Sequence, residues 1–112
     1  MTDRGPRTLS YTDKALADLE AAETWLRQHG SGPAAWAKFD AIVSAIEGLR
    51  AHPCRWPLGL HSGVRERLCA GGWRAFYEVD PDTGRDETAG DVRVLRVYAP
   101  GQDRSRFIAS TG

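Results

Sequence analysis

The segment from Val64 to Val79, VRERLCAGGWRAFYEV, most strongly limits how this chain can fold. Gly71 and Gly72 tolerate the positive φ angles of a two-residue turn, and the flanking residues alternate in polarity, so the segment is predicted to be a β-hairpin. The predicted pairs form two faces: Ala70 with Trp73, Leu68 with Ala75, Glu66 with Tyr77 and Val64 with Val79; then Cys69 with Arg74, Arg67 with Phe76 and Arg65 with Glu78. A shift by one residue would set apolar side chains opposite charged ones, which favours this register.

In this register three guanidiniums, those of Arg65, Arg67 and Arg74, lie on the face of the hairpin that does not join the core. A planar guanidinium donates two parallel hydrogen bonds to a phosphate or a carboxylate, so this face is a candidate binding surface. The alternative is that Arg65 forms a cross-strand ion pair with Glu78 and that the other two arginines are solvated.

The 112 residues are expected to form one domain, residues 1–112, with a core between two packed layers. Fifteen basic residues balance fifteen acidic ones, so the net charge is zero and does not indicate a nucleic-acid partner. No apolar run reaches membrane-spanning length and no signal-peptide pattern is present, so the protein is expected to be cytoplasmic. Cys54 and Cys69 lack the spacing of a metal motif and are expected to be free thiols.

Two amphipathic helices are predicted before the hairpin, over residues 13–30 and 33–51, because apolar residues recur there at spacings of three and four. Their apolar stripes contain Ala15, Leu16, Leu19, Ala22, Trp25 and Leu26 in the first helix, and Trp36, Phe39, Ile42, Val43, Ile46 and Leu49 in the second. Trp25 and Trp36 are therefore expected in the core, as is Trp73 at the start of a strand. The short connection predicts an antiparallel helical hairpin.

Strands are predicted over residues 6–11, 64–70, 73–79 and 91–99. Residues 53–63 are expected to be a crossing loop, residues 80–90 a mobile polar loop and residues 100–112 a tail without clear periodicity. The order β-α-α-β-β-β predicts an α+β fold in which an antiparallel sheet is backed by an N-terminal helical hairpin. One face of the sheet is then covered and the other is open.

With these elements in this order, the chain resembles the RelE/ParE superfamily, the toxins of type II toxin–antitoxin systems. The resemblance is carried by four stretches and a basic tail: YTDKALADL, PAAWAKFDAIVSAIEGLRAHP, VRERL with GGWRAFYEV, and VRVLRVYA. It extends from about Leu9 to Phe107. It implies a growth-inhibiting toxin of the kind that serves plasmid stabilisation.

The resemblance implies two possible activities. A RelE-like toxin is a ribosome-dependent mRNA endonuclease, and Arg65, Arg67 and Arg74 would then be catalytic, clamping the scissile phosphate. Arginine is a poor general base, so His61 is a weak candidate for proton transfer. Phe107 stands where this branch often carries a tyrosine.

A ParE-like toxin inhibits DNA gyrase and needs no catalytic residue. The long helical hairpin, its Pro-Ala-Ala entry, the balanced charge and Phe107 favour this branch. Arg65, Arg67, Arg74 and Arg104 are then the candidates for target binding. A third possibility is a non-toxic protein-binding relative whose arginines only form ion pairs.

Either branch implies a cognate antitoxin as partner, with DNA gyrase, or else the ribosome and mRNA, as target. The antitoxin would bind by strand addition to an open sheet edge or by packing into an apolar groove beside the helical hairpin. No cofactor and no membrane partner are expected. No metal site is expected either, because the candidate ligands lack the spacing of a metal motif: His29, His52, His61, Cys54 and Cys69.

Overall fold

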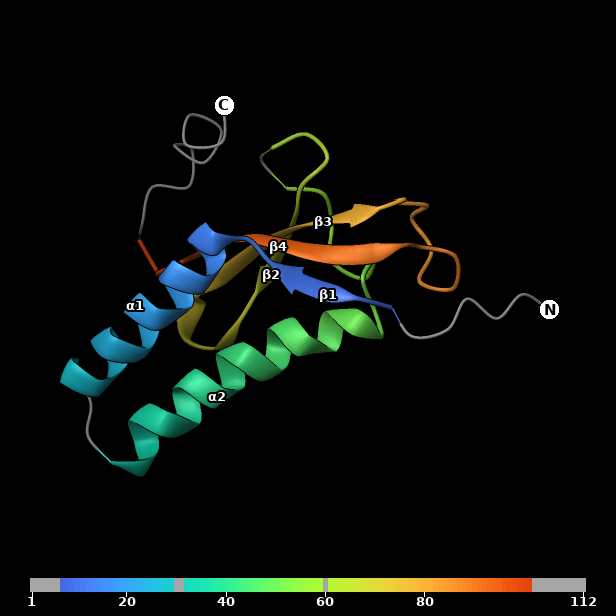
Figure 1. Ribbon diagram of the computed structural model, residues 1–112. Coiled ribbons are helices and arrows are strands. Elements are labelled where there is room, and N and C mark those ends of the chain that lie inside the picture. Colours follow the sequence, from blue (N-terminus) through green and yellow to red (C-terminus); the bar gives the residue numbers. More distant parts are fainter. Residues whose placement is uncertain (1–6, 30–31, 60, 102–112) are drawn as a thin grey trace.

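Two helices lie against one face of a four-stranded sheet in the computed structural model, which describes residues 7–29, 32–59 and 61–101 (Figure 1). The helices are α1 (Asp13–His29) and α2 (Pro33–Glu47), and a 3₁₀ turn, Gly48–Arg50, continues α2. The strands are β1 (Leu9–Tyr11), β2 (Arg65–Leu68), β3 (Arg74–Asp80) and β4 (Asp91–Tyr98). The α+β class and the order of the elements are as predicted.

The sheet has the strand order β1-β4-β3-β2 and is mixed. β2, β3 and β4 are antiparallel to their neighbours, whereas β1 runs parallel to β4 with Leu9 opposite Val92. The prediction of a purely antiparallel sheet is therefore wrong for β1. The chain between β1 and β4 contains both helices, β2 and β3, which is the long connection that parallel strands require. After β1, the N–H of Thr12 bonds the carbonyl of Val94 at 3.0 Å.

The main core fills the space between the helices and the sheet. From β3 it receives Ala75, Tyr77 and Val79, whereas Phe76 packs on the opposite face with Val64 and Tyr98. The helices contribute Ala15, Ala22, Leu26, Ile42 and Ile46, all buried. Because side chains alternate along a strand, these two sets belong to the two faces of the sheet.

A register shift in β4 explains an uneven spacing in its sequence. Val92 and Val94 lie opposite Val79 and Tyr77, but the next core residue is Val97, three positions on. The shift falls between Phe76 and Tyr77 and leaves Leu95 as the extra residue on β4. It returns Val97 to the helix-facing side, opposite Ala75.

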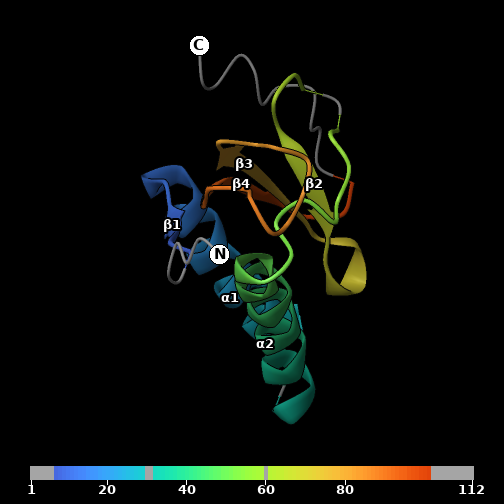
Figure 2. The same ribbon diagram turned by 90° about the vertical axis from the view of Figure 1, so that its right-hand side faces the viewer.

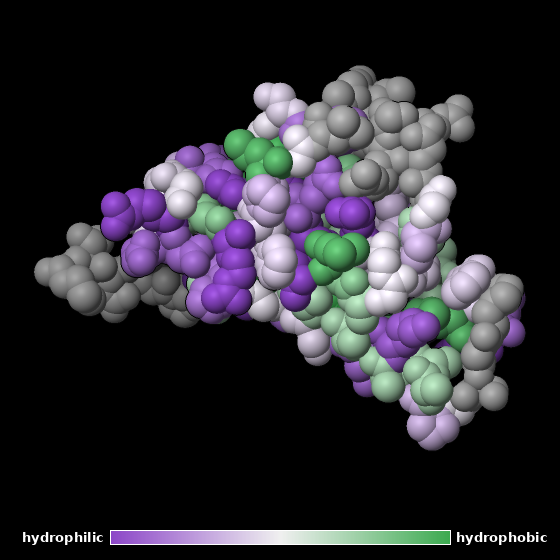
Figure 3. Space-filling model, turned by 180° about the vertical axis from the view of Figure 1, so that it is seen from behind, coloured by the Kyte–Doolittle hydropathy of each residue, from purple (hydrophilic) through white to green (hydrophobic). Residues whose placement is uncertain are grey.

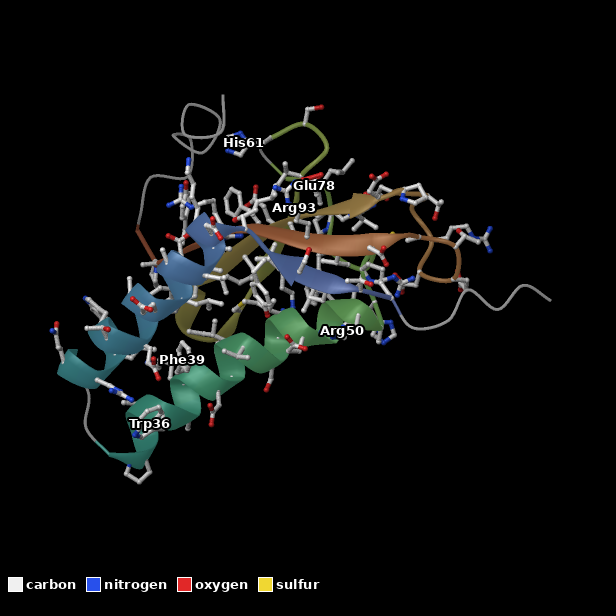
Figure 4. All side chains as sticks on the ribbon, in the orientation of Figure 1. Trp36, Phe39, Arg50, His61, Glu78 and Arg93 are labelled. Atoms are coloured by element: carbon white, nitrogen blue, oxygen red, sulfur yellow. The ribbon has the colours of Figure 1, made fainter. Side chains whose placement is uncertain are left out.

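The helical hairpin extends past the sheet at its closed end (Figures 1 and 2). Trp25 is 50% exposed, and Trp36, at the projecting end in Figure 4, is 44% exposed. The prediction that both lie in the core is wrong: Trp25 lines an open groove beside Trp73, and Trp36 lies near the projecting end of the hairpin. Trp73, 6% exposed, is in the core as predicted.

The loop between β3 and β4 was expected to be a mobile polar segment, but it is anchored at several points. Arg7 donates hydrogen bonds to the carbonyls of Gly90 at 2.8 Å, Asp86 at 2.6 Å and Ala89 at 3.0 Å. The carboxylate of Asp86 accepts the backbone N–H of Cys54 at 2.8 Å. These bonds hold the loop against the crossing segment.

Candidate functional site

The turn of the β2–β3 hairpin contains three residues, Ala70–Gly72, instead of the predicted two. Gly71 and Gly72 have φ angles of 69° and 87°, and Cys69 bonds the carbonyl of Trp73 across the turn at 2.7 Å. The extra residue shifts β2 by one position against β3, so the predicted register is wrong. The observed pairs are Arg65 with Tyr77, Glu66 with Phe76, Arg67 with Ala75 and Leu68 with Arg74.

A shift of one residue moves every side chain of β2 to the other face of the sheet. Arg65 and Arg67 therefore share a face with Tyr77 and Ala75, which is the side of the helices. Arg74 lies on the opposite face, across from Leu68. The prediction that the three guanidiniums form one surface is wrong.

Arg65 is enclosed and fully engaged. Its side chain is 9% exposed, and its Nε and Nη2 atoms donate to the two carboxylate oxygens of Asp82 at 2.8 and 2.9 Å. Nη1 donates to the carbonyls of Trp56 at 2.5 Å and Cys54 at 3.5 Å. The Arg65 guanidinium holds the pKa of the Asp82 carboxyl below its ordinary value. In this arrangement Arg65 joins β2 to two loops.

Arg67 and Arg74 are more accessible but occupy different surroundings. The Arg67 guanidinium stacks on the Trp56 ring, 3.9 Å from its centroid, in a small depression next to the end of α2. Arg74 lies 3.8 Å from the carboxylate of Glu66 on the other face. A single phosphate cannot be clamped by two guanidiniums on opposite faces of a sheet.

The face of the sheet opposite the helices carries ion pairs around an aromatic cluster. Glu78 pairs with Arg93 at 3.7 Å and not with Arg65 as the alternative reading predicted (Figure 4). His61 is 4% exposed and lies 5.9 Å from the Phe76 ring. It thus belongs to the face opposite Arg65 and Arg67. Arg104 and Phe107 lie outside the described residues.

The two cysteines are free thiols, as predicted. Burial raises the pKa of both thiols above the ordinary value. Among residues 7–29, 32–59 and 61–101, no group of three or more His, Cys, Asp or Glu side chains is placed to hold a metal ion. No helix within these ranges is long and apolar enough to cross a membrane.

A groove of about 450 Å³ opens between α1, the hairpin turn and the end of β4. Most of its lining is apolar: Ala21, Ala22, Trp25 and Leu26 from α1, Gly71 and Trp73 from the hairpin, and Val97, Ala99 and Pro100 from the end of β4. Apolar side chains also gather on the half of the molecule from which the helical hairpin projects in Figure 3. This groove is a concave and mainly apolar surface.

Two charged side chains, those of Asp18 and Lys38, line this groove. Asp18 is fully engaged, because its carboxylate accepts Nε of Arg96 at 2.8 Å, Nη2 of Arg96 at 3.1 Å and the N–H of Val97 at 2.9 Å. Lys38 forms no ion pair with any residue that the structure describes. Its stem lies over the hairpin turn, where a Cβ added to Gly71 would be 3.5 Å from Cδ.

Sequence reasoning did not identify Lys38 or Asp82 as important. A signal for Lys38 was present: it is one of only two lysines in a chain rich in arginine, within an apolar-striped helix. Asp82 gave no such signal, because an Asp in a polar loop usually reads as a turn residue. Only the three-dimensional path of the loop brings it to Arg65.

A helical hairpin on a four-stranded mixed sheet, with an apolar groove beside it, defines a small α+β domain of the RelE/ParE type. The family model described as ParE toxin of type II toxin–antitoxin system, parDE, matches residues 9–102. The chain therefore belongs to the ParE toxin family.

Solved structures agree with this fold. The chromosomal ParDE toxin–antitoxin system from P. aeruginosa contains a chain that is 20% identical, with a TM-score of 0.68, covering 84% of this chain and 96% of that one. The toxin–antitoxin complex RelBE2 from Mycobacterium tuberculosis contains a chain that is 23% identical, with a TM-score of 0.55, covering 89% and 98%. No curated protein matches the sequence.

Proposed function

We propose that this protein arrests growth by binding DNA gyrase, without catalysing a reaction, and that a cognate antitoxin neutralises it. Membership of the ParE toxin family supports the role as a toxin of a type II system. A toxin that inhibits by binding needs an exposed surface and no set of convergent catalytic groups. Its place of action would be the cytoplasm, where gyrase works.

The observation that carries the non-catalytic part of the proposal is the separation of the three hairpin arginines. A ribonuclease would need several groups aimed at one scissile phosphate. Arg65 already donates four hydrogen bonds to Asp82, Trp56 and Cys54. Arg67 and Arg74 lie on opposite faces, which disfavours the RelE-like alternative.

The predicted residues differ in how well they could contact gyrase. Arg67 and Arg74 are accessible enough to contact a protein partner, and each would do so from a different face of the sheet. Arg65 is a poor candidate for target binding, because contact with gyrase would require it to leave Asp82. Arg104 stays a candidate on the sequence pattern alone.

Growth of a host that expresses the chain from a tightly repressed promoter tests the proposal. Induction is expected to stop growth, and co-expression of the gene adjacent to the toxin gene on its chromosome or plasmid is expected to restore it. Normal growth after induction, with the folded protein present in the cells, would favour the non-toxic relative. The target is then identified with purified gyrase and with translating ribosomes.

A further inference from the structure

We propose that the depression at the end of α2, where Arg67 stacks on Trp56, is a contact site for the protein target of this toxin, and that it takes one carboxylate of that target. The inference rests on the proposed function and deepens it, because it assumes that the toxin acts by binding a protein. It adds the position of the contact, the chemistry of the bound group and the residue that anchors it.

Arg67 is held in place while one edge of its guanidinium stays open. The guanidinium lies over the Trp56 ring, 3.9 Å from the centroid, and Nη1 donates to the carbonyl of Leu68. Nε and Nη2 donate to no residue among 7–29, 32–59 and 61–101. The parallel N–H groups of this edge match the two oxygens of a carboxylate. Because stacking already restricts the side chain, little further freedom is lost when an anion binds.

Arg96 shows what the same arrangement binds inside this molecule. Its guanidinium lies 4.8 Å from the centroid of the Tyr98 ring and donates from Nε and Nη2 to the carboxylate of Asp18 at 2.8 and 3.1 Å. Arg65 binds Asp82 through the same two atoms. For Arg67, the described residues supply no such carboxylate, so the equivalent partner would come from another molecule.

The surroundings of Arg67 add positive charge and no negative charge. Arg55 also lines the depression, and neither arginine forms an ion pair with a described residue. No Asp or Glu is found among the lining residues that the structure describes. His52, which also lines the depression, is engaged by Asp86 at 3.3 Å. Two uncompensated guanidiniums around one depression attract an anion and repel a cation.

The size of the depression limits what can enter it. Its volume of about 120 Å³ is well below the roughly 300 Å³ at which pockets for small-molecule ligands begin. It therefore accepts a single side chain and not a length of chain. The surface of a folded protein presents a carboxylate in this way, and stacked Arg and Trp side chains are typical anchors of protein interfaces.

Two other sources of an anion fit less well. Nucleic acid is bound through many phosphates along an extended basic surface, whereas this chain has a net charge of zero. The depression also shares no lining residue with the apolar groove beside α1, so a partner can occupy either one without the other. The contacts of the target and of the antitoxin can therefore be tested separately.

The test changes Arg67 in three ways, with a matched control for two of them. Arg67→Ala removes the guanidinium, and its control Arg93→Ala removes an exposed one from the opposite face of the sheet. Arg67→Glu reverses the charge, and its control Arg85→Glu does the same in the loop after β3. Arg67→Lys keeps the charge without the planar fork, which gives a second variant if Arg67→Ala does not fold. Melting curves establish which variants are folded.

Two readouts are compared: the affinity of each variant for purified gyrase, and the arrest of growth in cells, which does not depend on the identity of the target. We expect the affinity to fall at least about tenfold for Arg67→Ala and about 100-fold for Arg67→Glu, with Arg67→Lys between wild type and Arg67→Ala. Both controls should stay within about twofold of wild type. Toxicity should fall in the same order. A change of the contacting Asp or Glu of gyrase to Arg should restore binding by Arg67→Glu.

Full affinity and full toxicity of the folded Arg67 variants would overturn the inference and leave the proposed function intact. Variants that stay fully toxic but escape the antitoxin would also overturn it, because the depression would then serve the antitoxin. Binding of Arg67→Ala that is reduced for gyrase with DNA but not for gyrase alone would assign a phosphate instead.

The two readouts separate this inference from the choice of gyrase. Growth arrest that depends on Arg67, without any binding of gyrase, would remove gyrase as the target and keep the depression as the target contact. A chain that neither arrests growth nor binds gyrase would overturn both.

Discussion

Arg65 and Asp82 form a two-point ion pair between the start of β2 and the loop after β3, with Nε to Oδ2 at 2.8 Å and Nη2 to Oδ1 at 2.9 Å. The guanidinium is 9% exposed and the carboxylate 25%. Both groups are thus largely removed from water, and the third donor of Arg65 binds loop carbonyls. The pair belongs to the scaffold that holds the crossing loop.

Replacing Arg65 with Ala is therefore expected to destabilise the protein. The change leaves the Asp82 carboxylate and the Trp56 carbonyl without their charged donor, and we expect a loss of about 2 kcal/mol in the free energy of unfolding. Urea denaturation measures it. Arg85→Ala, at a side chain 77% exposed, is the control and should change stability by less than about 0.5 kcal/mol. Equal effects of the two changes would contradict the scaffold role.

Stability should also depend on pH through Asp82. Its pKa in the folded protein is lowered by the hydrogen bonds from Arg65, relative to an ordinary value of 3.8. A lowered folded pKa means that the stabilisation is complete above the unfolded pKa and is lost as the pH falls through the folded pKa. Asp82→Asn should remove this part of the acid dependence. Identical acid profiles below about pH 4 for the two proteins would contradict the assignment.

Gly72, in the hairpin turn, and Gly48, at the end of α2, should respond in opposite ways to replacement by Ala. Gly72 has a φ of 87°, and an added Cβ would lie 3.2 Å from Cγ of Pro100, so Gly72→Ala should cost about 1–2 kcal/mol. Gly48, with a φ of −62° and no atom within 4 Å of an added Cβ, accepts Ala without strain. Gly48→Ala should stabilise by about 0.4–1 kcal/mol. Thermal melting of both variants checks the signs.

The two accessible hairpin arginines should not contribute equally to activity. Because Arg67 and Arg74 lie on opposite faces, a single flat contact with gyrase includes at most one of them. We expect at most one of the changes Arg67→Ala and Arg74→Ala to raise the concentration needed for half-inhibition of supercoiling more than tenfold. A large and equal loss in both folded variants would indicate a convergent site, as a nuclease requires.

The helices were predictable from the sequence because their periodicity is long and regular. The first helix was predicted over residues 13–30 and is observed over 13–29. The second was predicted over residues 33–51; α2 and the 3₁₀ turn that continues it together end at Arg50. The periodicity of a helix does not show how far along the helix the sheet packs against it. The projecting end of the hairpin, and the exposure of Trp25 and Trp36, therefore required the structure.

The arginine surface was mispredicted because one residue in a turn determines the faces of a whole strand. Alternation of polarity favoured a two-residue turn, but β2 is an edge strand, where Arg65 can reach Asp82 and Arg67 can stack on Trp56. Those partners come from distant loops, so local alternation contains no information about them. The same limit applies to the groove, which is built from four separate segments.

The central claim is inhibition of gyrase by binding, and parallel assays with the purified chain test it most directly. One measures ATP-dependent supercoiling of relaxed plasmid by gyrase, and the other measures cleavage of an mRNA during translation on ribosomes. We predict that the chain inhibits supercoiling in proportion to its concentration, that the antitoxin reverses the inhibition, and that the mRNA stays intact. Unchanged supercoiling together with cleavage of the ribosome-bound mRNA would contradict the claim.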